Sequence, residues 1–247
     1  MLNLNKFISI FILLLGFAVA WETPAHAATA VGQVIVASGD FVAVAVDGKS
    51  RPLKRKSEFY SGETLKTGAD GRAQIKFIDD ALVSLRPNTE FRVDEYRYDP
   101  ANKDINSSAT TLTKGSLRTI TGLIAKRNPP SYKITTPVAT IGVRGTDLEL
   151  ALGDDGLDIA FWKGEGTASN NAGKFNLGKD EQCQFAKIKN IDTEPVCQTA
   201  PLPGQQDSNE VIGDVTPDGA LFSDGVNDTN ENGNNDAVDD GTPLRGN

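Results

Sequence analysis

The residues from Tyr132 to Leu152, YKITTPVATIGVRGTDLELAL, constrain the fold more than any other stretch of the chain. The first half is rich in β-branched residues, which suit a pleated sheet. The second half alternates Leu148, Leu150 and Leu152 with polar or small residues, the period of two that is typical of a half-buried strand. Glycines separate the two halves. The stretch therefore predicts two strands that meet at a glycine-flanked corner.

The corner consists of Gly142, Val143, Arg144, Gly145 and Thr146. Arg144 is a cation within an apolar run, where an unpaired charge would be costly, so its guanidinium needs fixed acceptors. Two interpretations stay open. We favour a structural staple that ties neighbouring strands together, because buried charges are normally paired within the protein. The alternative is a contact for an anion or a partner.

Short strands separated by turn residues follow residue 27 along most of the chain. Residues 72–78 alternate, with Ala73, Ile75 and Phe77 on one face, and Gly-, Pro-, Asn- or Asp-rich turns separate neighbouring runs. This pattern predicts an all-β fold. The expected strands are 31–36, 41–46, 72–78, 81–85, 89–93, 111–121, the two of the central stretch, 157–163, two short runs within 167–177, and 182–188.

Residues 1–27 have the pattern of an export signal. Lys6 supplies a positive charge, residues 7–20 are apolar, and Ala25-His26-Ala27 is a small-x-small cleavage site. The apolar run is too short to cross a bilayer comfortably, so an uncleaved anchor is the weaker alternative. We expect a signal peptide at 1–27, a β-domain at 28–200, and a periplasmic or extracellular protein without a membrane span after cleavage.

The composition argues against common catalytic machinery. His26 is the only histidine and would leave with the signal peptide, which excludes Ser-His-Asp and Cys-His catalysis and histidine-ligated zinc. The Ser-x-x-Lys spacing is also absent. Paired carboxylates for an envelope polysaccharide hydrolase would have to be Asp79 with Asp80, or Asp154 with Asp155. Adjacent acids in turns are usually turn residues, so the sequence predicts a non-enzyme.

The two cysteines, Cys183 and Cys197, predict a disulfide. In an oxidising compartment an even pair usually forms one, and the spacing is not that of a C-x-x-C metal or redox motif. The closed loop would contribute about 3 kcal/mol in the chain-entropy account.

Residues 201–247 form an acidic, Asp/Asn/Gly-rich tail with ten acidic residues against one arginine, and we expect it to be disordered without a ligand. Part of it has the D-x-N-x-N-G spacing of a calcium loop, with oxygen ligands at alternate positions and a glycine at the bend. The candidate calcium ligands are Asp228, Asn230, Asn232, Asn234, Asp236 and Asp239. A chance match in an Asp/Asn-rich spacer is the alternative, and no other cofactor is expected.

Several motifs together resemble the FecR domain. They are GQV…G (32–39), YSGETLKTGADGRAQIKF (60–77), LVSLRPNTEFRV (82–93), KGSLR (114–118) and ITTPVATIGVRGTDLEL (134–150), and the similarity extends over roughly 31–187. The resemblance implies short stacked strands in a β-solenoid or roll-like sandwich, and a non-enzymatic signalling or interaction role. The best-known members are membrane regulators that relay receptor occupancy to a σ factor. We expect this chain to have neither the σ-binding segment nor a stable transmembrane helix, so the resemblance implies only the exported module here.

The sequence thus favours an exported interaction or sensing module for a protein or cell-envelope component. We expect no nucleic-acid partner, because the body outside the tail is close to neutral. Exposed strand edges are candidate binding sites, since a partner strand can add to them without any special motif. A calcium-stabilised surface or matrix attachment protein is the main alternative. The identity of the partner and the oligomeric state stay open.

Overall fold

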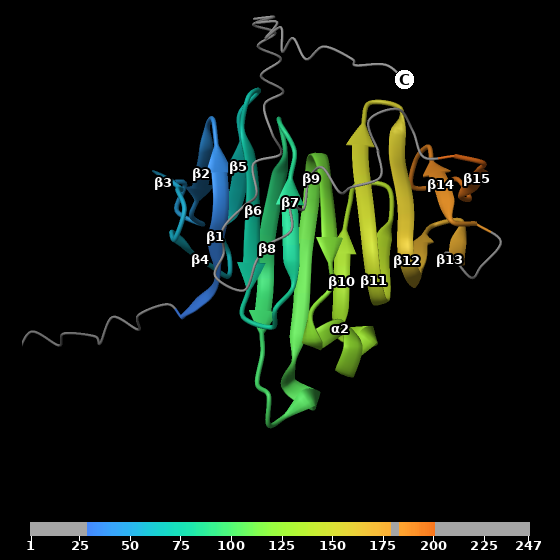
Figure 1. Ribbon diagram of the computed structural model, residues 1–247. Helices are drawn as coiled ribbons and strands as arrows, with labels where there is room; N and C mark the ends of the chain where they lie inside the picture. Colours follow the sequence, from blue (N-terminus) through green and yellow to red (C-terminus); the bar gives the residue numbers. More distant parts are fainter. Residues whose placement is uncertain (1–28, 179–182, 201–247) are drawn as a thin grey trace, which may run out of the picture.

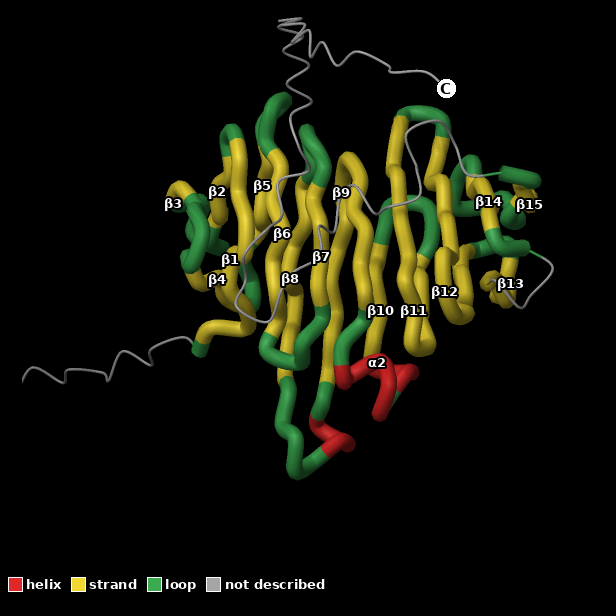
Figure 2. Tube along the Cα trace, in the orientation of Figure 1, coloured by secondary structure: helices red, strands yellow, loops and turns green. Residues whose placement is uncertain are grey.

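The computed structural model describes residues 29–178 and 183–200 and confirms the all-β prediction. In this part of the chain, fifteen strands form one continuous and mostly antiparallel sheet (Figure 1). The chain advances from β1–β4 at one end of the molecule to β13–β15 at the other. The helices are short and lie at one end of the strands (Figure 2). They are η1 (Lys103–Ile105), α2 (Leu123–Arg127) and η2 (Pro129–Ser131).

None of the helices in the described part has the length and apolar character that a membrane span requires. The signal peptide predicted at 1–27 and the acidic tail at 201–247, with its candidate calcium ligands, lie outside the described residues. The signal peptide and the calcium ligands therefore stay predictions.

Three long strands divide the sheet into two halves, because each pairs with different neighbours along its length. They are β9 (Ser107–Ile120), β11 (Thr140–Gly153) and β12 (Gly156–Asn170). The first part of β9, for example, pairs with β8 and β10, whereas its second part pairs with β7 and β11. We call the two halves layer A and layer B.

Layer A contains, in order, β3 (Ser50–Pro52), β2 (Phe41–Val44), β5 (Thr64–Thr67), β8 (Glu90–Arg97), the first part of β9, β10 (Tyr132–Thr135), the first part of β11, the last part of β12 and β13 (Gly173–Gly178). Layer B contains β4 (Glu58–Tyr60), β1 (Ala30–Ser38), β6 (Arg72–Phe77), β7 (Leu82–Leu85), the second parts of β9 and β11, the first part of β12, β14 (Phe185–Ile188) and β15 (Val196–Gln198).

Glycines mark the point at which each long strand passes from one layer to the other. Gly115 of β9, Gly145 of β11 and Gly164 of β12 have φ angles of +82°, +61° and +73°. Residues with side chains rarely adopt this region. The β11–β12 ladder shifts register between Arg144 and Asp147, so Gly145 lies in a β-bulge. The corner that the sequence predicts is therefore one of three glycine bends, and it lies beside the bend of β12.

The core lies between the two layers. Phe77 of layer B stacks on Tyr96 of layer A with ring centroids 4.2 Å apart, and Thr119 Oγ1 of layer B lies 3.2 Å from the hydroxyl of Tyr132 in layer A. Leu148 and Leu150 are fully buried, as their alternation predicts. These contacts across the gap confirm a sandwich-like roll.

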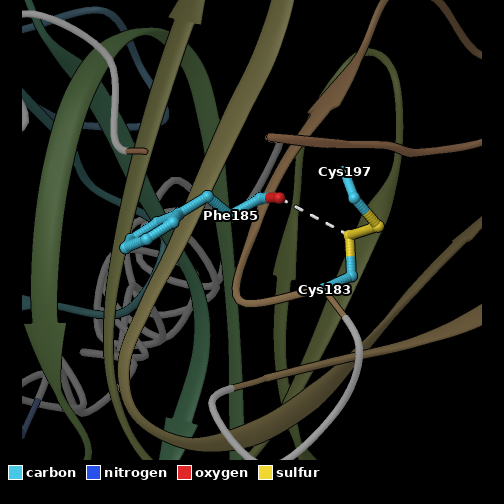
Figure 3. Close-up of a disulfide and its surroundings, with 3 residues drawn as sticks. All are labelled: Cys183, Phe185 and Cys197. Atoms are coloured by element: carbon cyan, nitrogen blue, oxygen red, sulfur yellow. Dashed lines mark hydrogen bonds between the residues drawn. A yellow bond between two sulfur atoms is a disulfide. The ribbon is translucent and has the colours of Figure 1, made fainter. Parts of the chain in front are cut away.

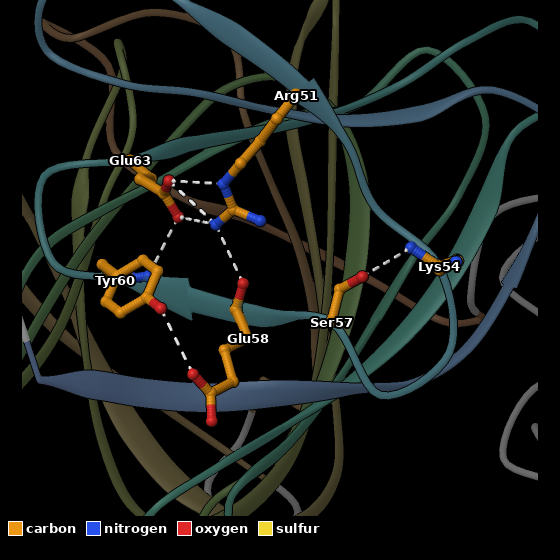
Figure 4. Close-up of polar contacts among 6 residues, drawn as sticks. All are labelled: Arg51, Lys54, Ser57, Glu58, Tyr60 and Glu63. Atoms are coloured by element: carbon orange, nitrogen blue, oxygen red, sulfur yellow. Dashed lines mark hydrogen bonds and ion pairs between the residues drawn. The ribbon is translucent and has the colours of Figure 1, made fainter.

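A polar network fastens the two layers at the N-terminal end of the sheet (Figure 4). Arg51 of layer A donates to both carboxylate oxygens of Glu63 at 2.8 and 2.9 Å and to the carbonyl oxygen of Glu58 in layer B at 2.8 Å. The same Glu63 carboxylate accepts a bond from the backbone N–H of Tyr60 at 2.9 Å. One guanidinium thereby joins β3, β4 and the turn before β5.

The predicted disulfide between Cys183 and Cys197 is present near the other end (Figure 3). Cys183 precedes β14, and Cys197 lies within β15, where it is paired with Ala186 in the β14–β15 ladder. The covalent bond thus holds the last strand of layer B on the sheet.

Candidate functional site

The candidate site is a groove on the outward face of layer A, over β10, β11, β12 and β13. Its volume is about 530 Å³. The groove includes Gly142, Val143 and Arg144 of the predicted corner. The lining residues are Pro129, Pro130, Tyr132, Lys133, Thr140, Gly142, Val143, Arg144, Glu165, Gly166, Thr167, Ser169, Lys174 and Asn176.

Strand register explains why the surface is hollow there. Lys133, Gly142, Thr167 and Asn176 lie opposite one another across four strands. The two middle positions carry small side chains, and longer side chains occupy both ends of the row. Gly142 and Thr167 therefore form part of the floor, and Lys133 and Asn176 stand at its rims.

The charge of the groove is mostly positive. Lys133, Arg144 and Lys174 line it, and Glu165 is the acidic residue among the lining side chains. The Arg144 guanidinium lies 3.4 Å from the Glu165 carboxylate in an exposed ion pair. Two lysines thus remain around a floor of hydroxyl groups and glycines, an arrangement that suits acidic groups of a ligand.

The expectation that Arg144 is buried is wrong, although it does form a contact between neighbouring strands. Its side chain is 75% exposed, and its ion-pair partner is Glu165, directly opposite on β12. Because the register shift places Arg144 on the outward face just before the bulge, its charge stays in water and needs no internal acceptors. The alternative interpretation, a contact for an anion or partner, fits this position.

Thr146 fastens the corner instead of Arg144. Its backbone N–H donates to Thr121 Oγ1 at 2.9 Å, and its carbonyl oxygen accepts from the Thr121 N–H at 3.0 Å. Thr146 and Thr121 are both buried. The corner is therefore held by paired threonines on β11 and the end of β9.

The buried arginine of the fold is Arg118, which sequence reasoning missed. It donates to both carboxylate oxygens of Asp147 at 2.7 and 2.6 Å, and its guanidinium lies 5.7 Å from the ring centroid of Trp162. Beside it, Arg86 and the indole N–H of Trp162 donate to the Glu149 carboxylate at 2.6 and 3.3 Å. The alternation in 111–121 and 147–151 places these charges on one face, but only pairing of β9 with β11 reveals the partners.

Neither candidate carboxylate pair forms a catalytic site. Asp79 is fully buried and accepts bonds from the Tyr96 hydroxyl at 2.5 Å and the backbone N–H of Ile124 at 3.0 Å. Asp80, at a positive φ of 68°, points outward and pairs with Lys76. One carboxylate is thus an internal acceptor and the other a surface charge.

The second pair consists of two exposed carboxylates in the turn between β11 and β12. Asp155 lies 2.6 Å from the Lys187 ammonium, whose hydrogen bond lowers the pKa of this carboxyl. Asp154 is exposed and has no role in that contact. A third acid, Asp158, lies 3.5 Å from the same ammonium, and its burial raises the pKa of its carboxyl. The arrangement is a surface ion-pair cluster beside β14.

In the described part of the chain, no group of three or more His, Cys, Asp or Glu side chains could hold a metal ion. The candidate calcium ligands between 228 and 239 fall outside that part, so calcium binding there stays a prediction.

Comparison with known proteins shows a family similarity over part of the chain. Residues 63–165 match the family FecR protein. The match begins just before β5 and ends within β12, which is narrower than the span of 31–187 over which motifs resemble the family. It includes the three glycine bends, β10 and β11, whereas β13 and the part of β12 under the groove, apart from Glu165, lie beyond it.

Solved structures show more distant similarity. Two crystal structures of "a putative anti-sigma factor" from Parabacteroides distasonis ATCC 8503 each align at 13% identity with a TM-score of 0.43. The alignment covers 55% of this chain and 58% of theirs, so the chain spans little more than half the length of those relatives. A "cell surface anchoring domain" aligns at 27% identity over 25% of this chain and 82% of its own, with a TM-score of 0.25. No curated protein matches the chain.

Proposed function

We propose that this chain is an exported sensing module whose FecR-like domain binds an acidic, extended segment of a partner protein in the layer A groove. The observation that carries the proposal is the placement of Lys133, Arg144 and Lys174 around a floor of small residues. A folded protein surface would clash with the rims, whereas an extended segment fits a shallow hollow that crosses four strands. Carboxylates on that segment would pair with the lysines.

The groove is a better-defined surface than the strand edges that the sequence suggests. In the described part of the chain, β3 and β13 end layer A, and β4 and β15 end layer B. Three of these edge strands are only three residues long, so they offer few backbone hydrogen bonds to an added strand. Binding across the groove face also brings all three cations within reach of one segment.

Binding rather than catalysis is supported by the contacts that already engage the candidate carboxylates. The Asp79 carboxylate accepts internal hydrogen bonds, and the Asp155 carboxylate forms an ion pair with Lys187. A hydrolase of the two-carboxylate kind needs both groups in one cleft at a fixed separation. Regulatory work through protein contacts is also what the FecR match favours.

Export to the periplasm or the cell exterior is part of the proposal. The disulfide between Cys183 and Cys197 supports it, because disulfides persist mainly in oxidising compartments. The signal pattern at 1–27 supports it independently.

The experiment starts by trapping the partner from the groove. A photoreactive amino acid replaces Asn176, which is exposed at the rim, and a second chain carries it at Lys54, at the opposite end of the sheet. Cross-linking is performed in the native envelope. We expect Asn176, but not Lys54, to capture a protein through an acidic stretch of its sequence.

Binding of the captured protein then tests the chemistry. The variant Lys133→Glu/Lys174→Glu reverses two groove charges, and Lys54→Glu/Lys126→Glu makes the same change in net charge at exposed positions outside the groove. We expect the affinity to fall at least about tenfold for the groove variant, equivalent to about 1.4 kcal/mol. The affinity of the control variant should stay within about twofold of the parent value. The affinity of the parent should weaken with added salt, because the contacts are between charges. Equal losses in the two variants would refute the proposal.

A further inference from the structure

A second polar surface crosses the outward face of layer B. Strand register aligns Gln74 of β6, Ser84 of β7, Arg118 of β9, Glu149 of β11 and Ala160 of β12. We call these five residues the central row. They lie on the face away from the core, since Ile75, Val83, Leu117, Leu148 and Ile159, their neighbours in the chain, are the residues buried between the layers.

The central row is buried although it faces away from the core. The exposed fractions of Gln74, Ser84, Arg118 and Glu149 are 5%, 2%, 7% and 0%. Figures 1 and 2 show the described helices at one end of the strands and not across a face of the sheet. Neighbouring side chains supply part of the cover, since Arg86 and Trp162 donate to the Glu149 carboxylate and the Trp162 ring lies 5.7 Å from the Arg118 guanidinium.

The central row, together with Arg86 that donates to its Glu149, contains hydrogen-bond donors without acceptors. The buried atoms Gln74 Nε2, Ser84 Oγ, Arg86 Nε and Arg118 Nη1 have no hydrogen-bond partner. Leaving such groups unsatisfied costs about 1–3 kcal/mol each. All four can donate, and the two guanidinium nitrogens can do nothing else. The missing partner must therefore supply acceptors, such as backbone carbonyls or carboxylates.

We propose that the start of this chain's own C-terminal segment, residues 201–215, lies across the central row and accepts these hydrogen bonds. The described chain ends at Ala200, two residues beyond β15, and β15 is the edge strand of layer B. The segment therefore begins at the edge of the face that contains the row.

Its length matches the distance. Between β15 and β7 there are five strand spacings of about 4.8 Å, or roughly 24 Å, which an extended chain covers in about seven or eight residues. Residues near 207–210 would then lie over Ser84, Arg86 and Arg118. Asp207 and Glu210 are the first acidic residues after Ala200, so carboxylates arrive where the unpaired guanidinium donors are.

This surface is distinct from the groove, because the two lie on outward faces of opposite layers. The segment would act as an internal cover for layer B, completing hydrogen bonds that the sheet leaves open. Partner binding on layer A does not depend on it.

The test uses photo-cross-linking within the full chain. A diazirine analogue of leucine replaces Leu82, a half-buried residue that lies on the same face as Ser84 and two positions before it. A control chain carries the analogue at Val46, which is 89% exposed in the turn after β2. Equal amounts of ¹⁵N-labelled and unlabelled chain are mixed, so that mass spectrometry separates links within one chain from links between two.

We expect links from Leu82 to residues 201–215 of the same chain and none of these from Val46. Two charge reversals then test the acceptors: Asp207→Lys/Glu210→Lys should lower the yield at least threefold, and Asp224→Lys/Asp240→Lys, with the same change in net charge, should leave it unchanged. Neither variant alters the sheet. The proposal is overturned if Leu82 links elsewhere or to a second copy, or if both reversals give equal yields.

Discussion

Arg118 and Arg144 contribute differently to stability, because one ion pair is buried and the other is exposed. Arg118 is buried between β7 and β11, with both oxygens of Asp147 bound and the Trp162 ring nearby. Arg144 stands in water opposite Glu165. Removing one partner of a buried pair leaves a desolvated charge behind, whereas an exposed pair contributes little.

We therefore expect Arg118→Met to lower the free energy of unfolding by about 3–5 kcal/mol, and Arg144→Met to lower it by at most about 1 kcal/mol. Urea denaturation of both variants measures the difference. The double variant Arg118→Met/Asp147→Leu should recover much of the loss, because it removes the stranded carboxylate. Similar losses for Arg118→Met and Arg144→Met would contradict this account.

Tyr132 makes the stability of the protein depend on pH at the alkaline end. Burial raises the pKa of its hydroxyl from the ordinary 10.0 to about 12, and burial raises the pKa of Tyr96 as well. Between pH 10 and 12 the unfolded tyrosine loses its proton first, which favours the unfolded state. The stabilising effect is complete below pH 10 and is lost as the pH rises through 12.

We expect the free energy of unfolding to fall by about 2–3 kcal/mol across that window from Tyr132 alone. Tyr132→Phe should be about 1 kcal/mol less stable at pH 7, because it loses the contact with Thr119. Its deficit should shrink, and then reverse, as the pH approaches 12. The free energy of unfolding of the variant should still depend on pH to some extent, because Tyr96 is still present. Parallel curves for parent and variant between pH 10 and 12 would show that Tyr132 does not titrate as described.

At the scale of elements, three glycines allow the long strands to serve both layers. Only the positive φ angle requires glycine at position 145, since a Cβ atom there would meet nothing within 4 Å. At position 164, both the positive φ angle and the close packing require glycine, since a Cβ atom would lie 2.6 Å from the Gly145 carbonyl oxygen. The bends of β11 and β12 are thus packed directly on one another.

Gly145→Ala should cost about 1–2 kcal/mol of stability, the strain of placing a side chain in the left-handed region. Gly164→Ala should cost clearly more, because it adds the clash. Gly48→Ala is a matched control, with a φ of +83° in a turn and no atom within 4 Å of a Cβ. Chemical denaturation of the three variants should rank Gly164 as the most sensitive, and a cost no larger than that of Gly48→Ala would contradict the packed bend.

For the molecule as a whole, the two ends of the sheet need fastening because edge strands are short. The Arg51–Glu63 network joins the layers at the N-terminal end, and the Cys183–Cys197 disulfide retains β15 at the other. The replacement Cys183→Ala/Cys197→Ala should lower the free energy of unfolding by about 2–4 kcal/mol. Thermal unfolding with and without reductant checks this. Reductant should shift the parent but not the double variant, and an unshifted parent would refute the role of the disulfide.

Sequence patterns alone predicted the all-β class, the bend between strands at Gly142–Thr146, and the pairing of the two cysteines. The alternation of apolar and polar residues, the turn residues and the even number of cysteines can be interpreted without knowledge of the fold. Sequence patterns predicted the wrong environment for Arg144, because whether a charge near a bulge faces water depends on the register shift between β11 and β12.

Only the tertiary structure decided which residues gather in the groove and in the central row. Lys133 and Lys174 are far apart in the chain, and Gln74 and Glu149 are farther still, yet strand register places each pair on one surface. Pairing between distant strands is a non-local outcome of packing, which no short window of sequence contains. Arg118 likewise became the buried cation only when β9 met β11, because that contact supplies Asp147.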